Sequence, residues 1–215
     1  MPSPAIKICG IATAAALDAA VEAGADHVGL VFFPPSPRAV SLADASALTD
    51  RAGDAIGRVG LFVDAQDRAI ADAVEAGRLT ALQLHGKETP ERAGHLRARF
   101  GLPVWKALPV AKASDVEAAE RYRDAADLVL FDAKTPNGAA LPGGMGLRFD
   151  WSLLAARPKG MRWGLAGGLS PANVAEAVAA TGAPLVDTSS GVETAPGAKD
   201  ADLIRAFCQA VRSTD

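Results

Sequence analysis

A cysteine and an aspartate stand at the ends of two short apolar runs that lie far apart in the sequence. The runs end Lys7-Ile8-Cys9-Gly10 and Leu130-Phe131-Asp132-Ala133. A thiol has an unperturbed pKa of about 8.5, so modest tuning can supply a thiolate base. A desolvated carboxyl group can keep its proton and act as an acid. Together the two groups favour proton transfer within one molecule, which is an isomerisation.

Two segments near the C-terminus have the composition of a phosphate site. They read Gly167-Gly168-Leu169-Ser170-Pro171 and Asp187-Thr188-Ser189-Ser190-Gly191. Bare backbone N–H groups and a helix N-terminus can hold an anion there, whereas the alternative is turn chemistry alone. We expect Gly167, Gly168, Ser189 and Ser190 to bind the phosphate group of a small substrate.

Two further polar side chains follow apolar runs. Arg38 ends the proline-stiffened loop Phe33-Pro34-Pro35-Ser36-Pro37, which restricts its conformations and suits bidentate recognition of a carboxylate. His85 follows Gln83-Leu84 and can bind or polarise a substrate. The sequence therefore predicts a substrate that carries an acid group at a distance from its phosphate.

Eight short β-rich runs position these residues, and several are apolar nearly throughout, as parallel strands buried on both faces are. They span residues 5–9, 27–33, 58–63, 81–84, 103–108, 128–131, 162–166 and 184–188. Segments with apolar residues at helical spacing alternate with them. These segments span residues 14–23, 42–51, 68–76, 91–100, 114–123, 151–156, 172–180 and 201–211.

Eight successive βα units predict right-handed crossovers and a closed (β/α)₈ TIM barrel, which is an α/β fold with one compact domain over residues 1–215. An open doubly wound sheet is the alternative, but Cys9-Gly10-Ile11 is not the glycine-rich fingerprint of that fold. In a barrel the carboxyl ends of the strands carry the chemistry. This placement favours catalysis by Cys9 and Asp132, whose residue types alone would suggest a packed thiol and a loop cap.

The composition excludes several other classes of protein. A net charge of -3, with 22 Lys and Arg scattered among 25 Asp and Glu, gives no field that attracts a nucleic acid. No apolar run approaches the roughly 20 residues of a membrane helix, and the first residues show no secretion signal. Cys9 and Cys208 lack the spacing of a disulfide framework or a zinc site. We expect a cytoplasmic protein, monomeric by default, that binds a small molecule and no metal.

Taken in order along almost the whole chain, these motifs resemble those of the phosphoribosylanthranilate isomerase family. The matching segments are Lys7-Ile8-Cys9-Gly10-Ile11, Ser36-Pro37-Arg38, Gln83-Leu84-His85-Gly86, Phe131-Asp132 with Lys134-Thr135, Phe149-Asp150-Trp151, Gly167-Gly168-Leu169 and Asp187-Thr188-Ser189-Ser190-Gly191-Val192-Glu193. The chain departs from the family pattern at Met145 and Ala166, where relatives commonly carry a hydroxyl residue. Met145 belongs to the long connection 134–150, which is expected to cover the site.

The resemblance implies a (β/α)₈ aldose-ketose isomerase of tryptophan biosynthesis that needs no cofactor. Such an enzyme converts N-(5'-phosphoribosyl)anthranilate to 1-(2-carboxyphenylamino)-1-deoxyribulose 5-phosphate by an Amadori rearrangement. The resemblance makes Cys9 the general base and Asp132 the general acid. It also implies that Arg38 contacts the anthranilate carboxylate, that His85 lines the pocket and that Asp187 lies near the sugar or the amine.

Two other functions stay open. The related isomerase of histidine biosynthesis performs the same rearrangement on a substrate with two phosphates, and its family resembles a duplicated half-barrel with Asp at the end of strand one. Here Cys9 holds that place, and the segments Val63-Asp64-Ala65-Gln66 and His85-Gly86-Lys87-Glu88 lack a second phosphate cradle. The other possibility is a barrel that binds a phosphorylated ligand without turnover, since a fold does not prove a function.

Overall fold

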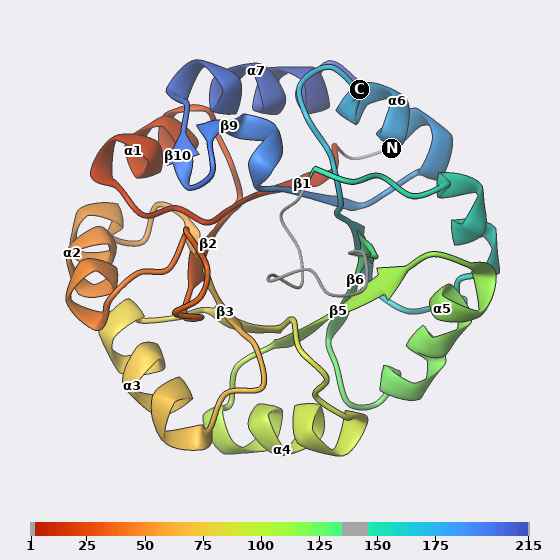
Figure 1. Ribbon diagram of the computed structural model, residues 1–215, viewed down its shortest axis with the longest axis horizontal. Coiled ribbons are helices and arrows are strands. Elements are labelled where there is room, and N and C mark those ends of the chain that lie inside the picture. Colours follow the sequence, from red (N-terminus) through yellow and green to blue (C-terminus); the bar gives the residue numbers. More distant parts are fainter. Residues whose placement is uncertain (1–2, 135–145, 215) are drawn as a thin grey trace.

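Eight parallel strands close into a barrel in the computed structural model, which describes residues 3–134 and 146–214. Each strand pairs with the next in chain order, and β1 pairs with β8 to complete the ring. Figure 1 shows the strands as an inner ring surrounded by helices. The strands are β1 (Ala5–Cys9), β2 (His27–Val31), β3 (Gly57–Phe62), β4 (Ala81–Leu84), β5 (Val104–Val110), β6 (Leu128–Ala133), β7 (Trp163–Leu165) and β8 (Leu185–Thr188).

Helices cover the outside of the ring because each presents one apolar side to the strands. The α-helices are α1 (Ala14–Glu22), α2 (Leu42–Ala52), α3 (Asp67–Gly77), α4 (Pro90–Phe100), α5 (Ala113–Glu117), α6 (Val174–Thr181) and α7 (Ala201–Arg212). The short 3₁₀ helices of the described residues are η1 (Ala118–Tyr122), η2 (Trp151–Ala156) and η3 (Ser190–Val192). In α7, Ile204, Phe207 and Val211 share the side that faces the strands and are fully buried. The predicted (β/α)₈ barrel is confirmed.

Side chains alternate along each strand between the helices and the barrel interior. In β1, Ile6 and Ile8 join the core beneath the helices, whereas Lys7 and Cys9 occupy the alternate, inward positions. One apolar cluster fills the interior next to these positions. It consists of Val59, Ala81, Trp105, Ala107, Leu128, Leu130 and Leu185. Polar inward residues such as Asp132 therefore stand at the carboxyl ends of the strands, beyond the apolar filling.

Some segments differ from the sequence-based expectation. Strand β6 continues past residue 131, so Asp132 lies within the strand. Helix α6 begins at Val174, because the Asn173 side chain accepts a hydrogen bond from the N–H of Ser170 and shapes a loop before it. An unpredicted antiparallel hairpin joins β9 (Glu193–Ala195) to β10 (Ala198–Lys199). The expected cover over residues 134–150, with Met145, falls largely outside the described residues.

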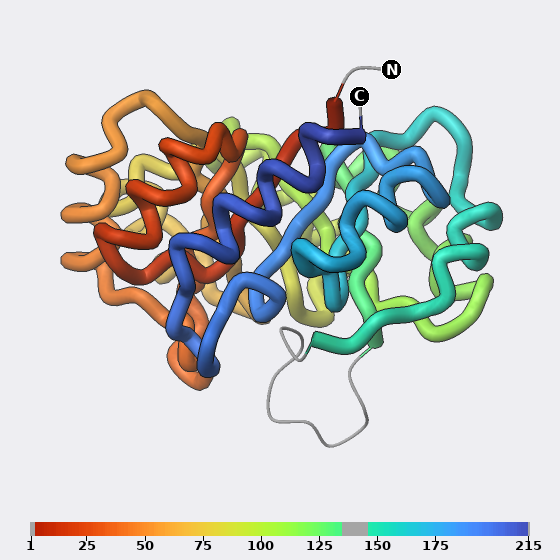
Figure 2. The backbone as a smooth tube through the Cα atoms, turned by 90° about the horizontal axis from the view of Figure 1, so that it is seen from above, coloured from red at the N-terminus to blue at the C-terminus, as the bar shows by residue number. Residues whose placement is uncertain are grey.

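The two ends of the barrel differ in what they carry. The first and last described residues lie at one end, whereas the hairpin β9–β10 and the loop after β2 lie side by side at the other (Figure 2). A Cβ atom on Gly197 of this hairpin would lie only 2.5 Å from the carbonyl oxygen of Pro37. Within residues 3–134 and 146–214, every helix is too short or too polar to cross a membrane.

Candidate active site

One pocket at the carboxyl ends of the strands is lined by all nine residues that the sequence singled out. The pocket encloses about 800 Å³, a volume that includes the open solvent at its mouth. The nine residues are Cys9, Arg38, His85, Asp132, Gly167, Gly168, Asp187, Ser189 and Ser190. Val31, Phe33, Leu61 and Val63 line the same pocket and give it an apolar wall that suits an aromatic ring.

Cys9 ends β1 with its thiol almost buried. Burial raises the pKa of the Cys9 thiol, and the nearby ammonium groups of Lys7 and Lys199 oppose that rise without cancelling it. The group is therefore held further toward the neutral thiol than an unperturbed cysteine. This direction is opposite to the tuning toward a thiolate that the sequence suggested.

A buried ion pair lies beside the thiol. Lys7 donates from Nζ to both carboxylate oxygens of Asp187, at 2.9 and 3.0 Å. Burial disfavours the Lys7 ammonium, but the attraction of Asp187 and Cys9 outweighs it and raises the pKa of Lys7 above its ordinary value. A fixed positive charge therefore stands next to the sulfur, inside the barrel.

Asp132 reaches the same pocket from β6, which β7 and β8 separate from β1 in the ring. Its Oδ1 accepts a hydrogen bond from the N–H of Ala133 at 2.8 Å. Its Oδ2 lies 3.3 Å from Nε2 of His85, whose other ring nitrogen lies 3.2 Å from the amide nitrogen of Gln83. These contacts fix the orientation of the carboxyl group.

Arg38 is held in a network of buried charges. Its Nε and Nη2 atoms donate to the two carboxylate oxygens of Glu193, and Lys199 contacts the same carboxylate. Burial disfavours the Glu193 carboxylate, but Arg38 and Lys199 outweigh that effect and lower the pKa of Glu193. One carboxylate between two cations leaves a net positive charge, which suits an acid group on a substrate.

In the loops after β7 and β8 the backbone has the tight, glycine-dependent conformation that lets N–H groups come close to a bound anion. Gly167 and Gly168 have φ angles of 84° and 64°, which glycine adopts without strain. A Cβ atom on Gly168 would lie 2.6 Å from the carbonyl oxygen of Leu147. Ser189 and Ser190 line the pocket from the neighbouring loop. Backbone N–H groups of such loops can hold a phosphate.

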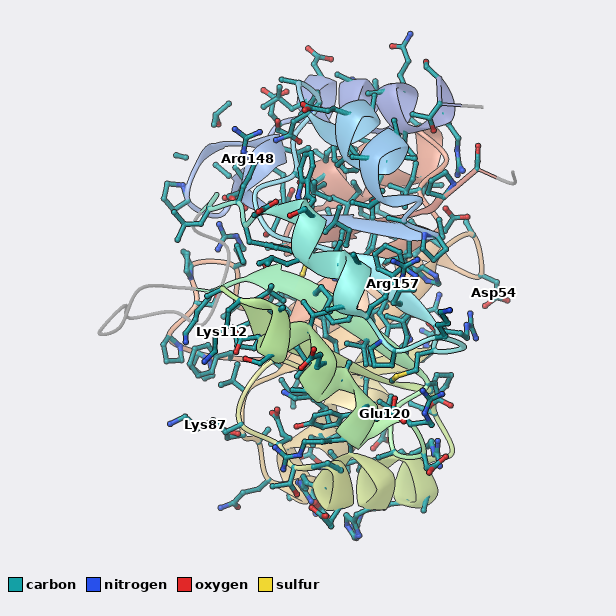
Figure 3. All side chains as sticks on the ribbon, turned by 90° about the vertical axis from the view of Figure 1, so that its right-hand side faces the viewer. Asp54, Lys87, Lys112, Glu120, Arg148 and Arg157 are labelled. Atoms are coloured by element: carbon teal, nitrogen blue, oxygen red, sulfur yellow. The ribbon has the colours of Figure 1, made fainter. Side chains whose placement is uncertain are left out.

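Basic side chains also stand around this end of the barrel. Figure 3 shows Lys87, Lys112 and Arg148 toward the end where the strands terminate, and Asp54 toward the other end. Positive charge near the mouth of a pocket raises the local concentration of an anionic substrate.

Four residues of the site were not singled out by the sequence. Lys7 and Gln83 each stand two residues before a predicted site residue, and residues at this spacing share one face of a strand. That polar interruption of an apolar strand is a signal that could have identified them. Glu193 and Lys199 belong to the unpredicted hairpin, and only the folded structure brings them to Arg38.

The chain matches known proteins along nearly its whole length. The family model for N-(5'phosphoribosyl)anthranilate (PRA) isomerase matches residues 6–210. An N-(5'-phosphoribosyl)anthranilate isomerase of Paramagnetospirillum magneticum is 56% identical over 207 residues, which cover 96% of each chain.

Solved structures agree with this match. Phosphoribosyl anthranilate isomerase from Thermotoga maritima is 36% identical with a TM-score of 0.86, covering 98% of this chain and 99% of that one. A phosphoribosyl anthranilate isomerase in complex with reduced 1-(o-carboxyphenylamino)-1-deoxyribulose 5-phosphate is 34% identical with a TM-score of 0.83, and the match covers 98% and 99% of the two chains. The chain therefore belongs to the N-(5'-phosphoribosyl)anthranilate isomerase family.

Proposed function

We propose that Cys9 and Asp132 carry the proton transfers by which this family member converts N-(5'-phosphoribosyl)anthranilate to 1-(2-carboxyphenylamino)-1-deoxyribulose 5-phosphate in tryptophan biosynthesis. One observation supports this assignment most. The thiol and the carboxyl group line a single pocket, which also holds a buried arginine and two glycine- and serine-containing loops. These features suit a substrate with a carboxylate at one end and a phosphate at the other.

The rearrangement begins when Asp132 gives its proton to the ribose ring oxygen. The C1–O bond breaks, and the nitrogen lone pair forms the C1=N bond of an iminium ion. Cys9, as the thiolate, takes the proton from C2, so that a C1=C2 bond forms and the iminium electrons return to nitrogen. The resulting enolamine gains a proton at C1 and loses the proton of its C2 hydroxyl, which gives the ketone. The enzyme is reset when Cys9 releases one proton and Asp132 takes one up.

The surrounding residues place the reacting atoms between the acid and the base. Arg38 binds the anthranilate carboxylate, and Asp187 faces the sugar or the amine. Gly167, Gly168, Ser189 and Ser190 hold the phosphate through backbone N–H groups. Because both charged ends are held, the C1–C2 bond is presented in one orientation. The Lys7 ammonium supports the negative charge that Cys9 must carry as a base.

The loops after β3 and β4 argue against a substrate with two phosphates. The N–H of Asp64 donates to Oε1 of Glu88 at 2.8 Å, and the N–H of Gly86 donates to Oε2 at 2.9 Å. The N–H of Lys87 donates to Oδ1 of Asp64 at 2.7 Å. The carboxylates of Glu88 and Asp64 thus accept the hydrogen bonds of the backbone N–H groups that a second phosphate would need. Their negative charge also repels an anion.

Turnover of the purified protein tests the proposal. Conversion of phosphoribosylanthranilate quenches its anthranilate-type fluorescence, and we expect the protein to accelerate this loss far beyond the spontaneous decay. The two-phosphate substrate of the histidine-pathway isomerase should not be converted. Binding of phosphoribosylanthranilate without acceleration would instead identify a non-catalytic barrel.

Three expectations from the sequence accompany the proposal. Turnover should survive dialysis against a chelator, since the family resemblance implies no metal or cofactor. Light scattering should give the mass of one chain, 21.9 kDa. Within the described ranges only Leu42 and Leu147 are large exposed hydrophobic residues, which supports a monomer. Cell fractionation should place the protein in the cytoplasm.

A further inference from the structure

Gln83 is a buried polar residue of the pocket to which the mechanism above gives no role. It lies on β4, lines the pocket and is 1% exposed. Its Nε2 atom lies 3.2 Å from Nδ1 of His85, and its Oε1 atom is buried without a hydrogen-bond partner among residues 3–134 and 146–214. Burying an amide oxygen in this way is unfavourable, so a polar residue at this position calls for a reason beyond packing.

The contact between Gln83 and His85 selects one form of the imidazole ring. An amide nitrogen donates hydrogen bonds and cannot accept them, so Nδ1 must be the accepting nitrogen. A neutral ring then carries its proton on Nε2. That Nε2 atom lies 3.3 Å from Oδ2 of Asp132, and such contacts often tighten only when a substrate binds. A chain of donors therefore leads from Gln83 through His85 toward Asp132.

We propose that Gln83 is a positioning residue that keeps His85 neutral and protonated on Nε2, so that His85 orients Asp132 without pairing with it as a cation. The proposal rests on the role of Asp132 as the general acid. An imidazolium ring would form an ion pair with the Asp132 carboxylate and hinder the return of its proton. A neutral N–H donor fixes the carboxyl group and leaves it a lone pair for that proton.

The charges around the ring make a neutral residue at position 83 important. Asp132 on β6 lies next to the ring. Asp187 on β8 also interacts with it, and is paired with Lys7 on β1. The third charged group is Lys106 on β5, which is paired with Glu88. Asp132 and Asp187 are both carboxyl groups that interact with His85. Lys106 is bound to Glu88 and to the backbone carbonyls of Leu84 and Gly86, on either side of His85. A third carboxylate at position 83 would stabilise the imidazolium, whereas the amide of Gln83 adds no charge.

Two substitutions separate this role from simple packing. Gln83→Glu keeps the shape of the side chain but adds a negative charge that accepts from Nδ1–H, whereas Gln83→Met removes the hydrogen bond without adding a charge. We expect kcat at pH 7 to be about tenfold lower in Gln83→Glu than in Gln83→Met, with a smaller difference in KM. In Gln83→Glu, kcat should recover toward the Gln83→Met value as the pH rises and the ring loses its extra proton. Packing alone predicts the reverse order, because glutamate is the closer match in shape.

The ring itself can be observed without turnover. The chain has 3 His, so the imidazole nitrogen signals are few, and the spectrum of His85→Asn identifies those of His85. Nitrogen-15 NMR of the wild type at pH 7 should show His85 protonated on Nε2 alone, and that of Gln83→Glu should show an imidazolium. In the His85→Asn background, Gln83→Glu should cost no more kcat than Gln83→Met.

These measurements test the role of Gln83 separately from the proposed function of the enzyme. A wild-type His85 protonated on Nδ1, or cationic at pH 7, would overturn it, as would a Gln83→Glu variant that is at least as active as Gln83→Met. If circular dichroism shows that Gln83→Glu does not fold, the wild-type spectrum still decides. Failure of the proposed function appears differently, as a wild type with no turnover whatever the state of the ring.

Discussion

Arg38 and Glu193 are joined by two parallel hydrogen bonds across the mouth of the barrel. Nε donates to Oε1 at 2.7 Å, and Nη2 donates to Oε2 at 2.8 Å. Arg38 comes from the loop after β2, and Glu193 begins the hairpin after β8. Both side chains are buried, at 7% and 3% exposure, so the guanidinium is held in one orientation. The hairpin therefore orients the group that we assign to the substrate carboxylate.

Glu193→Gln should weaken substrate binding more than it slows the chemistry. The amide keeps the shape but loses the charge that holds Arg38, so we expect KM to rise about tenfold with kcat within about threefold of the wild type. Steady-state kinetics measure both constants. Glu117→Gln, at an exposed position on α5, is the matched control and should leave both unchanged. An unchanged KM in Glu193→Gln would contradict this role of the hairpin.

The reactivity of Cys9 should depend in opposite directions on Lys7 and Asp187. Burial raises the pKa of the Cys9 thiol, Lys7 lowers it and Asp187 raises it. Lys7→Met should therefore slow alkylation of Cys9 by iodoacetamide at pH 8 about threefold or more, and Asp187→Asn should accelerate it. Mass spectrometry of the modified peptide follows the reaction.

Cys208 provides the control for this experiment. Burial raises the pKa of Cys208 to about 11, so this thiol should not react at pH 8. Cys208→Ser should accordingly leave the alkylation rate unchanged. If Lys7→Met reacts as fast as the wild type, Lys7 does not support the thiolate.

Gly168→Ala should impair phosphate binding. The residue has a φ of 64°, and a Cβ atom would lie 2.6 Å from the carbonyl oxygen of Leu147. We expect the inhibition constant of inorganic phosphate, measured as a competitor of the substrate, to rise about tenfold. Gly94→Ala on α4 is the control, since a Cβ atom there meets nothing within 4 Å. Equal inhibition constants in wild type and Gly168→Ala would place the phosphate elsewhere.

Asp67 should stabilise the protein only above acidic pH. Hydrogen bonds from His95 and Arg92 lower the pKa of Asp67 from 3.8 to about 2. Because its pKa is lower in the folded than in the unfolded state, its contribution is present above about pH 4 and is lost as the pH falls toward 2. Urea unfolding should show Asp67→Asn to be less stable than the wild type at pH 6, with the difference shrinking at pH 3.

The exposed Asp54 serves as the comparison for that series. Asp54→Asn should unfold like the wild type at both pH values. A stability difference between Asp67→Asn and the wild type that stays constant from pH 6 to pH 3 would exclude the ionisation of Asp67 as its source.

The sequence predicted the fold because strand and helix patterns are local. The alternation of apolar strands and helices repeats eight times, which predicts a barrel of parallel strands. All carboxyl ends of such strands lie at one end of the barrel, so Cys9 and Asp132 are expected there together. The nine site residues could be predicted in the same way, since each stands near the carboxyl end of a strand or in the loop that follows it. The ion pair of Lys7 with Asp187 could not, because it joins residues 180 positions apart.

The hairpin and the tuning of Cys9 were also beyond the sequence. The strands β9 and β10 are very short, and their turn packs against Pro37, which only the closed barrel brings near. The direction of the Cys9 pKa shift depends on burial by other strands and on the charges of Lys7, Asp187 and Lys199, so the position of Cys9 at a strand end could not predict it.

Turnover of phosphoribosylanthranilate by Cys9→Ala and Asp132→Asn tests the assigned acid and base most directly. With circular dichroism and substrate binding like those of the wild type, we expect each variant to lose about 100-fold or more in kcat, because each removes one of the two proton transfers. A kcat within about threefold of the wild type in either variant would contradict the division of acid and base between Asp132 and Cys9.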